Sequence, residues 1–153
     1  MKYQLLYGGD ERTWAVIFAA GDEAVAGLDQ FARAESLDAA RFTAIGGFAR
    51  ATLGYFDVVT SRYQPIPVDE QVEVLSLIGD IAQGDDGPKV HAHVVVGMAT
   101  GKTRGGHLLE GHVRPTLEVL VTESPGHLRR RFDPEFGIAL IDLTGDAAED
   151  RNR

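Results

Sequence analysis

The stretch His91-Ala92-His93-Val94-Val95-Val96-Gly97 does most to decide how the middle of this chain folds. Its β-branched valines favour a strand, in which successive side chains point to opposite faces of the sheet. His91 and His93 should therefore point to the same face. After a polar turn, a second apolar run begins with Gly105-Gly106-His107-Leu108. The separation of 14 residues allows His93 and His107 to be neighbours across a hairpin, so we predict a cluster of three histidines.

Three imidazoles form a common ligand set for a metal ion. Three neutral histidines with an open fourth position suit zinc or another divalent ion. The chain contains no cysteine, so any metal site must use histidine, aspartate or glutamate. We predict His91, His93 and His107 as the metal ligands. The alternative is that His91 and His93 are a core-facing pair that is hydrogen-bonded to backbone.

The other two histidines are not predicted as ligands. His112 follows His107 by five residues, and an odd offset on a strand places it on the opposite face unless a bulge intervenes. His127 stands beside Gly126, at the start of a predicted short helix, and we interpret it as a surface or capping residue.

The nearest carboxylates in sequence to the histidines are Glu110 and Glu118. Either could support a metal ligand or act as a general base, but a solvent-facing or intersubunit ion pair is the favoured interpretation. Glu73 lies within an apolar strand, where alternation turns it away from Val72 and Val74, toward solvent or a subunit interface.

The remaining sequence predicts strands around one main helix. That helix begins at Gly21-Asp22-Glu23, with Asp22 as N-cap, and ends near Ser36, because Val25, Leu28 and Phe31 recur at helical spacing. A second, short helix is predicted at 126–132, with Arg129-Arg130-Arg131 as its solvated last turn. The predicted strands are residues 3–7, 13–19, 42–48, 51–59, 72–79, 90–98, 106–112, 117–122 and 138–143. The expected fold class is therefore α+β, with a mixed, largely antiparallel sheet of about eight strands.

Length and composition suit one domain with an ordinary core. The chain has 153 residues, of which 44% are hydrophobic. We assign residues 1–144 to a single domain and 145–153 to a flexible, charged tail. No apolar stretch is long enough to span a bilayer, and the N-terminus lacks a signal layout, so a cytoplasmic location with no membrane partner is expected. The net charge of −8 makes nucleic acid an improbable partner for this chain alone.

Several motifs together resemble one known family, the plants-and-prokaryotes-conserved (PPC, or DUF296) domain. The resemblance covers roughly residues 4–143, and its specificity lies in the order and spacing of the motifs. The motifs are AIGGFARATLG at 44–54, EVLSLIG at 73–79, His91-x-His93, GHLxxG at 106–111 and PTLEV at 115–119.

This resemblance implies a compact domain with a mixed sheet. Prokaryotic members of the family are homotrimers, and their three histidines, matched here by His91, His93 and His107, bind zinc. In land plants the domain follows an AT-hook that contacts the minor groove of A·T-rich DNA. The present sequence contains no Arg-Gly-Arg-Pro hook, so the family's DNA-binding label is weakened for this chain.

Three functions remain open at this point. The first is a zinc-binding homotrimer that handles a small ligand, as a regulatory or interaction module. The second is a zinc-dependent hydrolase or lyase acting on a small molecule, because zinc held by three histidines activates water and polarises carbonyls; no general base can be named from the sequence. The third is a DNA-binding protein, against which the acidic composition argues.

Overall fold

The structure is a computed structural model that describes residues 1–144 of the chain. Residues 145–153, the predicted tail, lie outside the described residues. The elements are β1 (Lys2–Gly8), β2 (Arg12–Ala19), α1 (Ala24–Ala34), β3 (Ala39–Asp57), β4 (Arg62–Val68), β5 (Val72–Gly84), β6 (Gly87–Gly97), β7 (Thr103–Glu123), β8 (Arg129–Asp133) and β9 (Ile138–Asp142).

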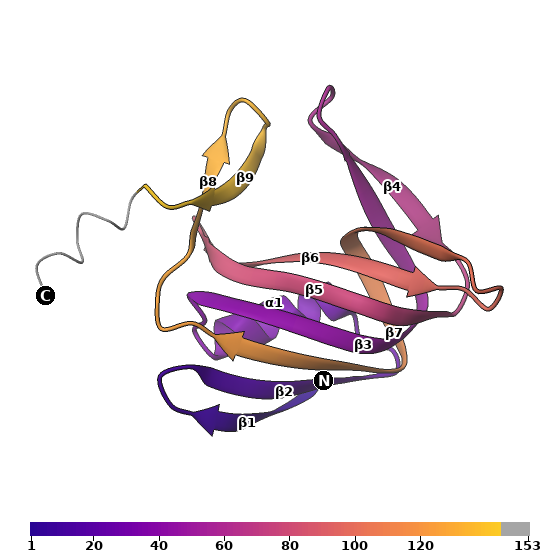
Figure 1. Cartoon of the computed structure of the whole chain (residues 1–153), viewed down its shortest axis with the longest axis horizontal. Coiled ribbons are helices and arrows are strands. Elements are labelled where there is room, and N and C mark those ends of the chain that lie inside the picture. Colours follow the sequence, from indigo (N-terminus) through magenta and orange to yellow (C-terminus); the bar gives the residue numbers. More distant parts are fainter. Residues whose placement is uncertain (145–153) are drawn as a thin grey trace, which may run out of the picture.

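The nine strands found in residues 1–144 belong to one mixed sheet. Its order is β1-β2-β7-β3-β5-β8-β9, while β4 pairs with β3, and β6 pairs with both β5 and β7. Only β5 and β8 pair in parallel among these described strands. Figure 1 shows that the β3–β4 and β8–β9 hairpins project to the same side, near opposite ends of β5 and β6. The expected α+β class with a largely antiparallel sheet agrees with this architecture.

Two pairs of predicted strands are single long strands. Residues 42–48 and 51–59 are joined in β3, and 106–112 and 117–122 are joined in β7. Gly46-Gly47 forms a bulge inside β3 and does not end the strand, since the register with β5 shifts between Ala44 and Gly46. Gly46 has a φ of +150°, and an added Cβ would lie 2.3 Å from the carbonyl oxygen of Thr116. A side chain at this position would hold β3 and β7 apart.

Helix α1 covers one face of the sheet and closes the core. Leu28 and Phe31 are fully buried on its inner side, and Phe31 packs edge-on against Trp14 of β2 with ring centroids 5.7 Å apart. The N-cap is Glu23 and not Asp22, because the Glu23 carboxylate accepts from the backbone N–H groups of Val25 and Ala26.

The prediction of a short helix at 126–132 is wrong, because Arg129–Asp133 forms strand β8. It pairs antiparallel with β9 and touches the end of β5 through Gln83 and Arg129. The interpretation of the arginine triplet as a solvated helix turn fails with it. In a strand, alternate residues point to opposite sides, and Arg130 is the one buried charged side chain among residues 1–144, at 9% exposure.

Large apolar side chains are more than half exposed on the sheet face opposite α1. Leu120, Thr43, Ile78 and His93 are consecutive partners in register across β7, β3, β5 and β6, so they share a face. Leu120 and Ile78 are 54% and 55% exposed, and Ile45 on the same face is 61% exposed. No helix within residues 1–144 is long and apolar enough to cross a membrane.

Candidate metal centre

The β6–β7 hairpin brings the three predicted histidines together. His91 and His93 are two residues apart on β6, and His107 of β7 is the direct register partner of His93. One possible ligand atom from each ring lies within 4.8 Å of the other two. The ring centroids are 5.1 Å apart for His91 and His93, 5.1 Å for His91 and His107, and 5.5 Å for His93 and His107. Strand alternation and a hairpin are sufficient to build this cluster.

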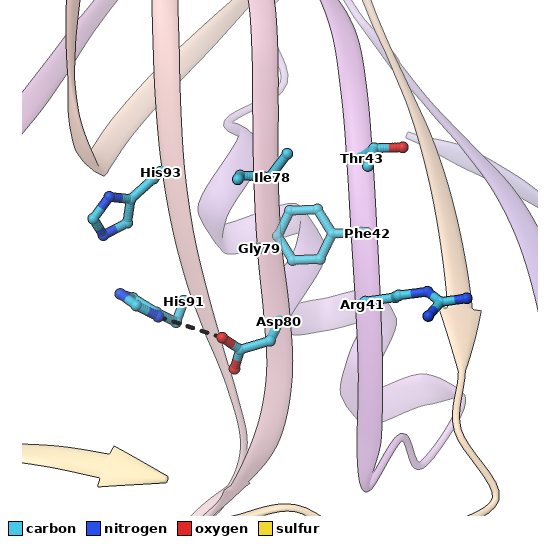
Figure 2. Close-up of a pocket in the computed structure, with 8 residues that line it drawn as sticks. All are labelled: Arg41, Phe42, Thr43, Ile78, Gly79, Asp80, His91 and His93. Carbon is cyan, nitrogen blue, oxygen red and sulfur yellow. Dashed lines mark hydrogen bonds and ion pairs between the residues drawn. The ribbon is translucent and has the colours of Figure 1, made fainter.

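A carboxylate on the neighbouring strand contacts His91. Asp80 of β5 is the register partner of His91, and its Oδ2 lies 3.4 Å from Nδ1 of the imidazole (Figure 2). An ionised carboxylate only accepts hydrogen bonds, so this contact favours the tautomer with hydrogen on Nδ1 and a free lone pair on Nε2. Asp80 thus orients His91 in the way that carboxylates orient metal-binding histidines.

A tyrosine from the β3–β4 hairpin contacts His107. The hydroxyl of Tyr63 in β4 lies 3.4 Å from Nδ1 of His107, and the two ring centroids are 4.6 Å apart. Burial raises the pKa of Tyr63, while the positive charge of Arg130 lowers it by less. The neutral phenol can accept from Nδ1–H of His107, which leaves Nε2 for a ligand. Two of the three rings therefore have an outer partner at Nδ1.

The electrostatic environment disfavours protonation of two of the three rings, His93 and His107. Burial, together with the smaller effects of the charges of His91, His93 and Arg130, lowers the pKa of His107 to about 4. Burial, followed by the charge of His91, lowers the pKa of His93. A metal ion binds the unprotonated ring, so a low pKa removes the competing proton at neutral pH.

Asp80 stays ionised beside these rings. Burial alone would raise the pKa of Asp80, but the hydrogen bonds from His91 and Arg130 outweigh that effect and lower it. The cluster therefore places one negative charge beside three imidazole nitrogen donors.

A cavity adjoins the cluster on the exposed sheet face. Its volume is about 400 Å³. The residues that line it are Arg41, Phe42, Thr43, Ile78, Gly79, Asp80, His91 and His93. Figure 2 shows the Arg41 guanidinium on the far side of the cavity, directed away from the two histidines. The space next to the histidines is therefore bounded mainly by apolar and imidazole groups.

The other residues considered from sequence lie outside the cluster. His112 contacts Glu110 at 2.5 Å and Arg50 at 3.0 Å. His127 is 74% exposed on the approach to β8, where it contacts Asp38. Glu73 and Glu118 line a separate depression on the exposed sheet face, together with Ile45 and Leu75. The described part of the chain thus offers one group of three metal-binding side chains, His91, His93 and His107.

Sequence reasoning missed three residues around the cluster: Tyr63, Asp80 and Arg130. Asp80 follows directly on the predicted strand 72–79, and pairing that strand with 90–98 in the right register would have found it. Tyr63 lies 44 residues before His107 and has no local signal. Arg130 was assigned to a solvated helix turn, where a buried contact is not expected.

Fold and site together define an α+β domain with a three-imidazole cluster at the edge of an apolar sheet face. A family model described as the Plants and Prokaryotes Conserved (PCC) domain matches residues 5–125. The chain belongs to this family, as the resemblance to the PPC domain indicated.

Solved structures of related proteins share the fold along nearly their whole length. A plant- and prokaryote-conserved (PPC) protein from Pyrococcus horikoshii is 32% identical, with a TM-score of 0.81, covering 92% of this chain and 94% of its own. A metal-containing protein from Archaeoglobus fulgidus is 30% identical, with a TM-score of 0.80, covering 93% and 99%. A protein from Ralstonia eutropha for which DNA binding has been suggested is 33% identical, with a TM-score of 0.79, covering 85% and 90%.

The curated relatives are much longer than this chain. The bifunctional protein GlmU of a Synechococcus strain is 31% identical over 137 residues, which are 88% of this chain and 21% of that protein. GlmU of a second Synechococcus strain is 34% identical over 113 residues, which are 72% of this chain and 17% of that protein. The chain therefore spans about a fifth of the length of the curated relatives it matches.

Proposed function

We propose that this protein is a zinc-binding, homotrimeric member of the PCC family that handles a small ligand at its histidine cluster, as a regulatory or interaction module. The observation that carries the proposal is the convergence of three imidazoles, two of which have an outer partner at Nδ1. The Archaeoglobus relative described as metal-containing supports it. The cytoplasmic location expected from the sequence stays a prediction.

The donor set fits a divalent metal ion of the zinc type. Nitrogen atoms around a tetrahedral zinc ion with bonds of about 2.1 Å lie about 3.4 Å apart. The ligand atoms of the cluster already lie within 4.8 Å of one another, so side-chain rotation is sufficient to close the set. His91, His93 and His107 would hold the ion, with Asp80 and Tyr63 as their outer partners.

A zinc ion held by three imidazoles offers a further coordination position, lowers the pKa of bound water and acts as a Lewis acid. The adjoining cavity of about 400 Å³ would admit a small molecule beside that position. The same features keep a hydrolase or lyase as the alternative function. In that case Tyr63 and Asp80 are the ionisable groups closest to the histidines that could move a proton.

Metal analysis tests the central claim. The purified protein should contain about one zinc ion per chain, and His93→Ala should lose it. His127→Ala is the matched control, because this histidine is 74% exposed and lies outside the cluster. A wild-type protein that stays metal-free when incubated with zinc would refute the metal site and with it the hydrolase alternative.

The trimer is supported by the apolar sheet face next to the cluster. Ile45, Ile78 and Leu120 are each more than half exposed there, which is unusual for three neighbouring large aliphatic side chains. Light scattering should give three times the chain mass of 16.5 kDa. Leu120→Asp should shift the mass toward one chain. Val59→Asp, at a 90% exposed position of the β3–β4 turn, should not.

DNA binding is the second alternative and rests on the description of relatives such as the Ralstonia protein. The net charge of −8 opposes it, because binding to the DNA backbone depends on lysine and arginine. Fluorescence anisotropy with duplex DNA should detect no binding at physiological salt. Tight, salt-sensitive binding would restore this function.

A further inference from the structure

The β8–β9 hairpin is a part of this chain that the family model does not match. The match ends at residue 125, whereas the hairpin spans Arg129–Asp142. The hairpin is attached to the sheet at the end of β5, where Gln83 N–H donates to the Leu128 carbonyl over 2.8 Å. Figure 1 shows it beside that end of β5 and β6. Its attachment lies on the strand that carries Asp80.

Arg130 of this hairpin contacts the carboxylate that orients His91. Its Nη2 donates to Oδ1 of Asp80 over 2.6 Å, and its Nη1 donates to the carbonyl of Ala139 in β9 over 3.3 Å. The other oxygen of Asp80, Oδ2, faces Nδ1 of His91 at 3.4 Å. A continuous chain of contacts therefore leads from the hairpin backbone through Arg130 and Asp80 to the histidine cluster.

The two carboxylate oxygens of Asp80 have different partners, Arg130 and His91. A carboxylate that served only Arg130 would accept from both Nε and Nη2, in the bidentate arrangement typical of arginine. Here Asp80 gives one oxygen to Arg130 and the other to His91, and the buried Nε of Arg130 has no hydrogen-bond partner among the described residues. An unpaired buried N–H costs stability. This arrangement therefore holds the hairpin less firmly than a bidentate ion pair would. It leaves the second oxygen of Asp80 free to accept from His91.

We propose that Arg130 is a positioning residue of the metal centre: it fixes the Asp80 carboxylate so that His91 presents Nε2 to the cluster. The proposal rests on the metal-binding function proposed above. The contact from Arg130 to Asp80 is much shorter than the one from Asp80 to His91, so Arg130 determines where the carboxylate lies. Without it, Asp80, whose side chain is already 28% exposed, turns toward water, and the 38% exposed ring of His91 loses its orientation.

The test compares zinc affinity, measured by competition with a chromogenic chelator, in wild type, Arg130→Met, Arg130→Lys and Asp80→Asn. Removal of an outer partner of a metal-binding histidine typically weakens metal binding about 10- to 100-fold. We expect a loss of that size in all three variants. The double variant Arg130→Met/Asp80→Asn should lose no more than Asp80→Asn alone, because both changes break one chain of contacts.

The neighbouring Arg131 provides the matched control. It lies on the same strand, its side chain is 55% exposed, and it pairs with Asp142 of the same hairpin at 2.9 Å. Arg131→Met should leave zinc affinity within twofold of wild type. The visible absorption spectrum of the cobalt-loaded protein gives a second readout, since it reports ligand geometry directly. It should change in Arg130→Lys and stay unchanged in Arg131→Met.

The possible outcomes separate this inference from the proposed function. If wild type binds no metal, the proposed function fails and this inference fails with it. If wild type binds zinc and Arg130→Met binds equally well or more tightly, only the inference is wrong. If Arg130→Met weakens binding but Arg130→Lys behaves like wild type, the charge of residue 130 acts without positioning Asp80, and the inference is again wrong. If Arg130→Met does not fold, the Arg130→Lys and Asp80→Asn variants decide.

Discussion

Replacing Gly79 by alanine tests the packing that places the histidines. Gly79 lies on β5 beside Asp80 and pairs with Ala92, between His91 and His93 on β6. A Cβ added at Gly79 would lie 2.3 Å from the carbonyl oxygen of His91 and 2.3 Å from Cζ of Phe42. Figure 2 shows the Phe42 ring lying over this glycine. The absence of a side chain thus lets β6 and the Phe42 ring approach β5 closely.

The expected cost follows from these two contacts. Non-bonded carbon atoms pack at about 3.5–4.0 Å, so the ring and the β6 backbone must each move by more than about 1 Å. Phe42 is only 2% exposed and belongs to the hydrophobic core, so moving its ring disturbs the packing of its neighbours. Overpacking of this kind costs about 1–3 kcal/mol, and a backbone neighbour places Gly79→Ala at the upper end. Alanine also reduces the conformational entropy of the unfolded chain, which stabilises the folded protein by about 0.4–1 kcal/mol. We expect a net loss of about 2 kcal/mol.

Urea unfolding followed by circular dichroism, with a chelator present, measures this loss directly. A matched control is Gly126→Ala, whose Cβ would meet only the Ser124 hydroxyl oxygen at 3.9 Å. The free energy of unfolding of this control should lie within about 0.5 kcal/mol of the wild-type value. Because Gly79→Ala pushes on the His91 carbonyl, it should also weaken zinc binding. A loss of stability below about 0.5 kcal/mol for Gly79→Ala would show that the strand spacing is not fixed by this glycine.

Three further predictions concern the cluster and the core. Tyr63→Phe removes the hydroxyl next to His107 and should weaken zinc binding about tenfold with little effect on unfolding; equal affinity would show that the hydroxyl does not orient the ring. Leu77→Ala, at a fully buried site of β5, should cost about 2–5 kcal/mol in urea unfolding, and a smaller loss would mean that the core collapses around the deleted atoms. In metal-free protein, the lowered pKa of His107 means that the unfolded chain takes up a proton that the folded chain resists, so stability should fall from pH 6.5 to about 4. His107 is half-buried, so solvent screening leaves about 1 kcal/mol of this effect; His107→Gln should flatten that pH dependence, and an unchanged slope would assign the effect to other groups.

The histidine cluster could be predicted because every step is local. Period-2 alternation puts His91 and His93 on one face, and a short turn returns the chain so that His107 meets His93. The bulge at Gly46-Gly47 follows from an equally local rule, because adjacent glycines in an apolar run indicate close backbone approach. Short-range rules of strand geometry are sufficient for these features.

What could not be predicted depends on long-range register. Asp80 meets His91 only because β5 and β6 pair in one particular alignment, and Tyr63 reaches His107 from a hairpin 44 residues earlier. The arginine triplet misled the prediction for another reason. Local sequence rules place three consecutive arginines in solvent, whether the segment is a helix or a strand. In the structure, alternation along β8 leaves Arg129 and Arg131 exposed and turns Arg130 inward. Its partner, Asp80, is 50 residues away.

Register also connects the histidine cluster to the uncovered sheet face. His107, His93, Ile78, Thr43 and Leu120 form one continuous row of directly opposed residues across β7, β6, β5, β3 and the far half of β7. Residues in such a row share a face, so whatever covers Ile78 also covers the approach to His93. The cavity beside the histidines is lined by three members of this row. If the protein is a trimer through this face, assembly therefore changes the walls of the cavity. Access to the metal centre and the oligomeric state then depend on each other, because the same strand register places the histidines and the exposed apolar side chains on one face.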